Sequence, residues 1–218
     1  MATLMKSKTI APLPRKASRQ IRRQQLTEAT IIALAQKGQA RLKLQDVADT
    51  AGLSYGLVNF YFETKEKLLT ETLRYMAAEY RANWQEALAG AGDSPARQLN
   101  ALLQADFNET IYTPSRLMAW CTFWGEAQSR PYYQQECGAS DMEYIRVMEG
   151  ICARLIAESG GALKPARVAR VIRVTMEGLW LDLITTGAPY SRKECLRTVY
   201  TCAMAFFPHY FDDKGLRR

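Results

Sequence analysis

The chain has 218 residues, 48% of them hydrophobic and 23% charged, which gives a globular protein enough apolar material for a buried core. No apolar run reaches the roughly 18–20 residues that a membrane-spanning helix needs, and the basic N-terminus lacks the apolar centre of a secretory signal. We therefore expect a cytoplasmic protein without a membrane partner. With one histidine and five widely spaced cysteines, we also expect no histidine-based triad, no disulfide framework, and neither a metal nor another cofactor.

The positive charge of the chain is concentrated at its N-terminus. The formal net charge is +7, and residues 1–23 contain seven basic side chains and no acidic one. We interpret residues 1–17, with two prolines and little periodicity, as a disordered basic arm in front of a folded module. Such an arm is typical of proteins that bind a polyphosphate such as DNA, although a solubilising tail or a membrane-surface patch would carry the same charge.

Three helices are predicted in residues 18–63. Apolar residues recur at three- and four-residue spacing until Gly38, which stops the pattern. A second, one-sided apolar stripe covers Leu44–Ala51 and predicts a helix of two turns. After a turn of three residues, Ser54 can cap a third short helix over Tyr55–Phe60.

The second and third predicted helices form a helix-turn-helix, a motif that places a recognition helix in the major groove of DNA. Ala48 and Ala51 are small enough for the two helices to approach closely, and Gly52 tolerates the positive φ of the turn. Leu53 and Leu57 are expected to fill the angle between the helices. An ordinary helical hairpin shares single features of this set, but the ordered set together with the basic arm favours DNA binding.

The predicted DNA contacts come from the arm, from helix starts and from the outward face of the third helix. Polar and aromatic side chains on that face can reach base edges or phosphates, and a glycine permits close approach to the duplex. Lys65 begins the next helix and is placed to meet a phosphate with help from the helix dipole. The full predicted set is Arg22, Lys43, Ser54, Tyr55, Gly56, Asn59, Phe60, Tyr61 and Lys65.

The stretch Leu44–Leu69, reading LQDVADTAGLSYGLVNFYFETKEKLL, resembles the DNA-binding signature of TetR-family repressors. Two positions depart from the pattern of that family. Asn59 replaces a tyrosine that touches phosphate in many members, and Lys43 replaces the usual threonine or serine cap of the second helix. The matching features are Val47-Ala48, Ala51-Gly52-Leu53-Ser54, Tyr61-Phe62, Lys65 and Leu68-Leu69.

The rest of the chain shows only helical periods. We expect a connecting helix over residues 64–90, an effector-binding and dimerisation domain over residues 91–211, and a tail over residues 212–218. The predicted fold class is therefore all-α, with an N-terminal three-helix domain that contains the helix-turn-helix and a C-terminal helical bundle. The TetR resemblance implies that this bundle binds a small-molecule effector and forms a homodimer.

By the same resemblance, two long helices over residues 165–186 and 192–207 form the dimer pair. Their apolar side chains could equally form the core of a single subunit, and both alternatives stay open here. These side chains are Val168, Ile172, Leu179 and Leu183 in the first helix, and Leu196, Val199, Cys202, Met204 and Phe206 in the second.

Aromatic and acidic residues of the second domain indicate a class of effector. Trp120 and Trp124 lie one helical turn apart, and Glu177 lies one turn before Trp180, with Asp182 nearby. Aromatic faces beside a carboxylate suit a quaternary ammonium, whose charge the rings attract and which cannot donate hydrogen bonds. The alternative is that the tryptophans are core residues and that the acids reach solvent, and the residue types alone favour this alternative.

Segments 107–110 (FNET), 118–124 (MAWCTFW) and 177–181 (EGLWL) resemble the choline-responsive, BetI-type branch of the family. This resemblance implies a repressor that controls conversion of choline to glycine betaine, with choline or a related quaternary amine as effector. The predicted effector-binding set is Trp120, Trp124, Glu177, Trp180, Phe107 and Asp182.

The mechanism that follows is a homodimer whose third helices enter successive major grooves of double-stranded DNA. Symmetry then predicts a near-palindromic operator with half-sites roughly 34 Å apart or a little more. The chain has no glycine-rich phosphate loop, nucleophile elbow or clustered metal ligands, so we do not expect an enzyme. A regulator of the same fold that senses another molecule, an activator, and a non-specific nucleic-acid binder remain as alternatives.

Overall fold

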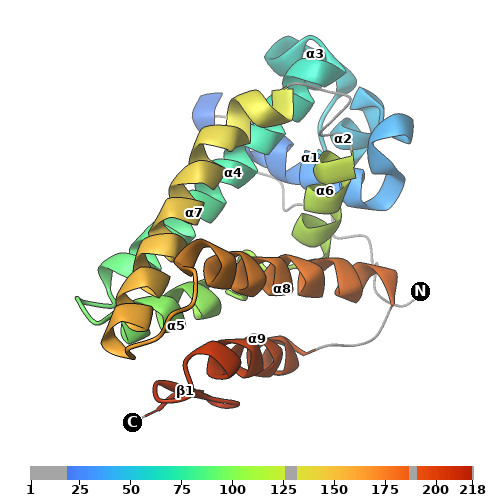
Figure 1. Cartoon of the computed structure of the whole chain (residues 1–218). Helices are drawn as coiled ribbons and strands as arrows, with labels where there is room; N and C mark the ends of the chain where they lie inside the picture. Colours follow the sequence, from blue (N-terminus) through green and yellow to red (C-terminus); the bar gives the residue numbers. More distant parts are fainter. Residues whose placement is uncertain (1–18, 126–131, 187–190, 218) are drawn as a thin grey trace. The chain divides into compact units, whose positions relative to one another are not determined.

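The computed structural model describes residues 19–125, 132–186 and 191–217, and the predicted basic arm lies outside them. The described residues are almost entirely helical, with one short β-hairpin near the C-terminus (Figure 1). The predicted all-α fold class is confirmed. None of the described helices is both long and apolar enough to cross a membrane.

The chain divides into two compact units. Unit 1 comprises residues 1–78 and 113–137, and unit 2 comprises residues 79–112 and 138–218. This division differs from the expected boundary near residue 90, because the chain leaves the N-terminal unit within a helix and later returns to it.

Unit 1 contains the helix-turn-helix region. Its central helix is α1, which packs against α2 and α6 and buries Leu26, Ile31 and Leu34 completely. The elements of this unit are α1 (Arg19–Arg41), α2 (Leu44–Ala51), α3 (Tyr55–Phe62), the first part of α4 (Lys65–Ala89), α6 (Pro114–Gly125) and the first residues of α7 (Tyr132–Glu158).

Two features of unit 1 refine the sequence prediction. Gly38 interrupts α1 with φ 70° and ψ 163°, so the glycine that ends the apolar pattern also ends the regular helix, and one further turn leads to Arg41. Helix α6 was expected in the effector domain, yet it belongs to unit 1. The reason is its apolar face, since Leu117 and Phe123 are buried where α6 packs along α1.

Unit 2 is a helical bundle with a hairpin attached. Serines cap two of its helices, as Ser94 accepts from the backbone N–H of Arg97 and Ser191 from that of Glu194. Its elements are the rest of α4, α5 (Pro95–Asp106), most of α7, α8 (Pro165–Thr185), α9 (Arg192–Phe206), β1 (Phe211–Asp212) and β2 (Gly215–Leu216).

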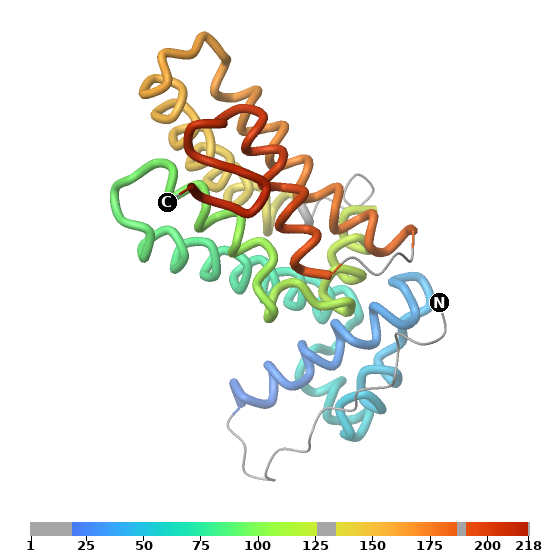
Figure 2. The backbone as a smooth tube through the Cα atoms, turned by 90° about the horizontal axis from the view of Figure 1, so that it is seen from below, coloured from blue at the N-terminus to red at the C-terminus, as the bar shows by residue number. Residues whose placement is uncertain are grey.

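The chain folds back beside α9 after that helix ends (Figure 2). Strands β1 and β2 pair antiparallel, with Phe211 opposite Leu216, and Phe211 is fully buried. Gly215 has φ 131°, and a Cβ atom there would lie 3.3 Å from the Tyr200 ring. Residues 212–217, which we predicted as a tail, are therefore part of the packed unit.

The apolar residues of α8 lie on two different faces. Val168, Ile172 and Leu179 are buried within unit 2, where α8 packs on α9, so for these residues the core alternative is correct and the dimer alternative is wrong. Val199 of α9 is likewise buried. The residues that remain for an interface form a separate exposed stripe of Val171, Val174, Gly178 and Leu181 on α8. The others on the predicted list, Leu183, Leu196, Cys202, Met204 and Phe206, are half-buried.

Candidate DNA-binding surface and effector site

The turn of the helix-turn-helix has the predicted geometry. Gly52 adopts the left-handed conformation, with φ 66° and ψ 35°, and ends α2. The backbone N–H of Leu53 then donates to the carbonyl of Ala48 at 2.9 Å, which closes the last turn. Ala48 and Ala51 are fully buried, as close packing of the two helices requires.

Each of the two short helices has an N-terminal cap. Ser54 Oγ accepts from the backbone N–H of Leu57 at 3.3 Å, so Ser54 caps α3 as predicted. At α2 the capping group is the Asp46 carboxylate, which accepts from the Lys43 backbone N–H at 2.8 Å and from Lys37 Nζ at 2.6 Å. Burial opposes ionisation of Asp46, but these hydrogen bonds outweigh it and lower its pKa. The exposed Lys43 side chain is thus not needed as a cap.

Helix α3 presents a polar and aromatic face to solvent. Tyr55 is 48% exposed and Phe60 is 69% exposed, and Gly56 and Asn59 are exposed beside them. Exposed aromatic rings grouped on one face are typical of a surface that binds a partner. The four residues share one surface with the exposed Ser54, while Tyr61 is half-buried behind Phe60.

The opposite face of α3 holds the helix in place. Val58 and Phe62 are buried, at 0% and 2% exposure, whereas Leu53 and Leu57 are only half-buried. Helix α3 continues to Phe62 and turns Val58 and Phe62 towards the core, so these two residues anchor it more deeply than the pair expected between the helices.

Arg22 and Lys65 make contacts within the protein. Arg22 is 8% exposed and donates to Gln25 Oε1 at 2.6 Å, and Gln25 in turn donates to the Ala51 carbonyl at the end of α2. This burial contradicts the expectation of a phosphate contact at Arg22. The half-buried Lys65 ammonium donates to the Gln39 carbonyl, so it ties the start of α4 to the end of α1.

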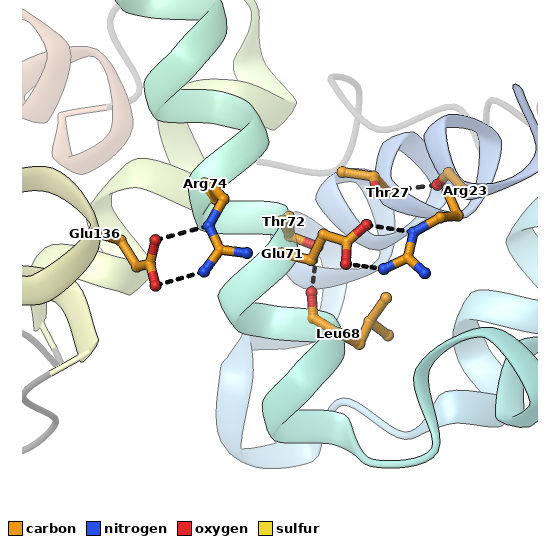
Figure 3. A network of polar contacts seen from close by, with 7 residues as sticks. All are labelled: Arg23, Thr27, Leu68, Glu71, Thr72, Arg74 and Glu136. Atoms are coloured by element: carbon orange, nitrogen blue, oxygen red, sulfur yellow. Dashed lines mark hydrogen bonds and ion pairs between the residues drawn. The ribbon is translucent and has the colours of Figure 1, made fainter. Parts of the chain in front are cut away.

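A chain of ion pairs joins the helices of unit 1 (Figure 3). Arg23 of α1 forms a bidentate salt bridge with Glu71 of α4. Arg74 of α4 forms a second bidentate salt bridge with Glu136 of α7, with N–O distances of 2.8 and 2.7 Å. Arg23 also lies 5.2 Å from the ring centre of Phe62, a cation–π contact with α3. The Arg23 side chain thus connects α1 with both α3 and α4.

A second polar junction lies on α1. Glu28 Oε1 accepts from Tyr75 of α4 and from Arg116 of α6, both at 2.8 Å. Both partners of the ion pair are partly shielded, with side-chain exposures of 15% for Arg116 and 27% for Glu28. One carboxylate therefore connects three helices of unit 1.

The predicted effector residues fall into the two units. Trp120 and Trp124 belong to unit 1, where their rings stack with centres 6.1 Å apart and Trp120 is buried. The other four belong to unit 2. There Phe107 and Trp180 are buried, Glu177 pairs with Arg173 at 2.5 Å on the same helix, and Asp182 is half-buried.

Unit 2 also contains a group that we did not predict, the acid–aromatic cluster of Asp106, Tyr80, Trp84, Tyr144 and Trp180. Asp106 is 5% exposed and accepts a hydrogen bond from the Tyr80 hydroxyl at 2.8 Å. The rings meet edge to face, with centres 5.9 Å apart for Tyr80 and Tyr144, 6.0 Å for Tyr80 and Trp180, and 5.5 Å for Trp84 and Tyr144. Four helices supply this cluster, so no single stretch of sequence reveals it.

Burial dominates the electrostatics of this cluster. It raises the pKa of Asp106 to about 7, although hydrogen bonds from Tyr80 and Trp180 act in the opposite direction. The nearby Glu177 carboxylate also contributes to this rise. A carboxyl with this pKa is poised to change charge near neutral pH.

A groove of about 610 Å³ also lies along α4 and α5 of unit 2. Its lining includes Asn83, Asn100, Gln104, Asn108 and Arg192. Within the described part of the chain, Glu86 is the one carboxylate in this lining, and the lining contains no aromatic ring, so the groove fits a quaternary ammonium poorly. Among the described residues, no group of three or more His, Cys, Asp or Glu side chains is placed to hold a metal ion.

Two family descriptions match the chain, one for each functional half. Residues 26–72 match "Bacterial regulatory proteins, tetR family", and residues 95–208 match "BetI-type transcriptional repressor, C-terminal". The chain belongs to the TetR family. Regulators of this family bind DNA and small-molecule effectors and act as dimers, and they are not enzymes.

Relatives of this TetR-family chain include regulators named BetI. That of Paraburkholderia xenovorans is 30% identical over 85% of this chain and 93% of its own length. That of Burkholderia thailandensis is 29% identical over the same shares of the two chains. The resemblance to BetI-type regulators that the sequence suggested is therefore confirmed.

Solved structures share the fold at lower identity. A transcriptional regulator from Pseudomonas aeruginosa superposes with a TM-score of 0.74 at 23% identity, covering 88% of this TetR-family chain and 93% of its own. The regulator FadR of Bacillus subtilis, solved with stearoyl-CoA, superposes with a TM-score of 0.67 at 15% identity, covering 84% and 97%. At these identities the likeness establishes the fold alone.

Proposed function

We propose that this chain is a homodimeric repressor that binds a near-palindromic operator and releases it when a small cation binds to unit 2. The observation that carries the DNA-binding part is the exposed face of α3, where two aromatic rings, an asparagine and a glycine lie on a helix with a well-defined cap. Such a face fits the major groove, which admits one α-helix.

The residues of this surface have distinct roles in the proposal. Tyr55 and Asn59 reach base edges or nearby phosphates, and Gly56 lets the backbone approach the duplex. Lys43 lies at the start of α2, where its charge and the helix dipole both favour a phosphate. Phe60, the most exposed of the rings, contacts the sugar–phosphate wall or a thymine methyl group.

A second copy of the chain is the proposed partner of the exposed stripe on α8. Val171, Val174 and Leu181 are 42%, 51% and 51% exposed, and Gly178 between them allows close approach of another helix. Covering this stripe buries apolar surface that is otherwise unfavourably exposed to water. The dimer then sets the spacing of the two α3 helices.

Choline or a related quaternary amine is the proposed effector. The acid–aromatic cluster supplies both groups that such a ligand requires, since aromatic rings attract its charge and Asp106 can neutralise it. Trp180 comes from the predicted effector set, and Glu177 lies close enough to influence Asp106. The relatives named BetI are consistent with this class of ligand.

Fluorescence anisotropy with DNA from upstream of the gene, and with scrambled DNA as a control, tests the proposal. We expect tight binding to the upstream DNA only, weakened by millimolar choline. Tyr55→Ala and Asn59→Ala should remove the preference, whereas Asp93→Asn, an exposed position in unit 2, should not. Equal, salt-sensitive affinity for both DNAs would instead indicate a non-specific binder.

A further inference from the structure

Asp106 lies in a setting that is unfavourable for an unpaired negative charge. It is the last residue of α5, is 5% exposed, and is surrounded by rings of the acid–aromatic cluster. The Tyr80 hydroxyl donates a hydrogen bond to its carboxylate at 2.8 Å, and Trp180 interacts with the carboxylate from α8. Neither partner carries a charge that neutralises the carboxylate.

The ionisable groups around Asp106 are acidic or neutral. Tyr80 of α4, Tyr144 of α7, Tyr112 in the segment after α5 and Glu177 of α8 all interact with it electrostatically. Two basic residues lie nearby, and each has another partner. The Arg173 guanidinium is paired with Glu177 at 2.5 Å, and Arg192 donates to the backbone carbonyl of Phe107, the residue after Asp106. Within the described parts of the chain, no basic side chain forms an ion pair with Asp106.

A buried carboxylate without a cation takes up a proton, because desolvation penalises its charged form. A bound organic cation offers the other way to neutralise it. The cluster suits such a ligand, since the rings of Tyr80, Tyr144 and Trp180 are grouped together and the face of an aromatic ring attracts a charge that cannot donate hydrogen bonds.

Trp84 adds an independent observation. Its side chain is 3% exposed and its ring meets that of Tyr144, yet its indole N–H has no hydrogen-bond partner among the residues that the structure describes. A buried N–H without an acceptor is unfavourable by an amount comparable to a lost hydrogen bond. A ligand with an oxygen atom beside its cationic centre would supply that acceptor.

We infer that Asp106 is the counter-ion of the effector, so that binding of a cationic ligand displaces a proton from this carboxyl and the site selects a charged ligand over a neutral one of the same shape. This inference rests on the proposed function, because it specifies the residue that recognises the effector's charge. Glu177, the acid that the sequence suggested, is already paired with Arg173 and contributes at most indirectly.

Calorimetric titration of the full chain with choline and with its uncharged isostere, 3,3-dimethylbutan-1-ol, tests the inference. The pKa of Asp106 is about 7, so its ionised fraction rises about tenfold between pH 6 and pH 8, and choline affinity should rise by the same factor. The isostere should bind with the same affinity at both pH values. In buffers of different ionisation enthalpy, choline binding at pH 7 should release about half a proton per site.

Asp106→Asn provides the matched variant, with Asp93→Asn as the control because it makes the same change at an exposed position of unit 2. We expect Asp106→Asn to reduce choline affinity at pH 8 at least tenfold, to abolish the pH dependence and to leave binding of the isostere unchanged. The pH profile of the unmodified chain decides the question even if the variant does not fold.

The outcomes separate the two proposals. Choline binding that is independent of pH and unaffected by Asp106→Asn would overturn the counter-ion inference and leave choline as effector. Equal affinity for choline and its isostere would also overturn the counter-ion inference and leave choline as effector. If choline does not bind at either pH, both the inference and the proposed effector are overturned, while specific binding to operator DNA would still support a repressor.

Discussion

The buried carboxyl of Asp106 makes a quantitative prediction about stability that needs no ligand. Its pKa is about 7 in the folded chain, against an ordinary value of 3.8 for an exposed aspartate. A carboxyl whose pKa is higher in the folded state binds more protons there than in the unfolded state. Stability therefore falls as the pH rises from about 4 to about 7, and this contribution is constant above that window.

The magnitude follows from the two pKa values. Each pKa unit corresponds to about 1.4 kcal/mol, and integration between pH 5 and pH 8 gives a loss of about 2.5 kcal/mol in the free energy of unfolding. Asp106→Asn cannot ionise and should not show this loss. Relative to the unmodified chain, the variant should therefore gain about 2.5 kcal/mol between pH 5 and pH 8.

Urea unfolding at pH 5, 6.5 and 8, followed by circular dichroism, measures this difference. The protein concentration must be the same throughout, because a dimer gains stability with concentration. Only the change of the free energy of unfolding with pH is compared between the two proteins. The contributions of other titrating groups therefore cancel. Any pH-independent effect of the amide group that Asp106→Asn places beside the Trp180 N–H cancels as well. Identical pH profiles for the two proteins would refute the argument that Asp106 is buried without a counter-charge.

Three further predictions concern other parts of the chain. Leu181→Asp places a charge in the exposed stripe of α8, and sedimentation velocity should show monomers where the unmodified chain forms dimers; an unchanged dimer would place the interface elsewhere. Gly52→Ala should lower the free energy of unfolding by about 1 kcal/mol in urea unfolding, because alanine is strained at a φ of 66°. No atom lies within 4 Å of the added Cβ, so this strain is the whole effect. An unchanged free energy of unfolding would contradict this reasoning. Glu28→Gln should destabilise unit 1 by about 1–2 kcal/mol, because it leaves the Arg116 guanidinium beside a neutral partner. The melting temperature should fall accordingly, and Glu149→Gln on α7 serves as the control.

Local chemistry explains what could be predicted from the sequence. Gly52 and Ser54 act within one turn of their own helix, so their residue types and spacing suffice to place the helix-turn-helix. The exposure of Tyr55, Asn59 and Phe60 followed from the same register.

Tertiary packing explains what could not be predicted. Arg22 is basic and close to the arm, but its burial depends on Gln25 and on the end of α2. Asp106 directly precedes the FNET segment, yet its importance depends on rings from three other helices. Both faces of α8 carry apolar residues, so periodicity alone could not tell which face is core.

The C-terminal hairpin has a consequence for anyone who shortens or extends this chain. Phe211 fills the core, the Arg217 N–H donates to the Tyr210 carbonyl at 2.8 Å, and Gly215 rests on the Tyr200 ring. A stop codon introduced just after α9 would expose that ring and leave a hole where Phe211 lies. Cloning boundaries and affinity tags therefore belong after residue 217, because the hairpin residues before it pack on α9 and cover the core at the end of unit 2.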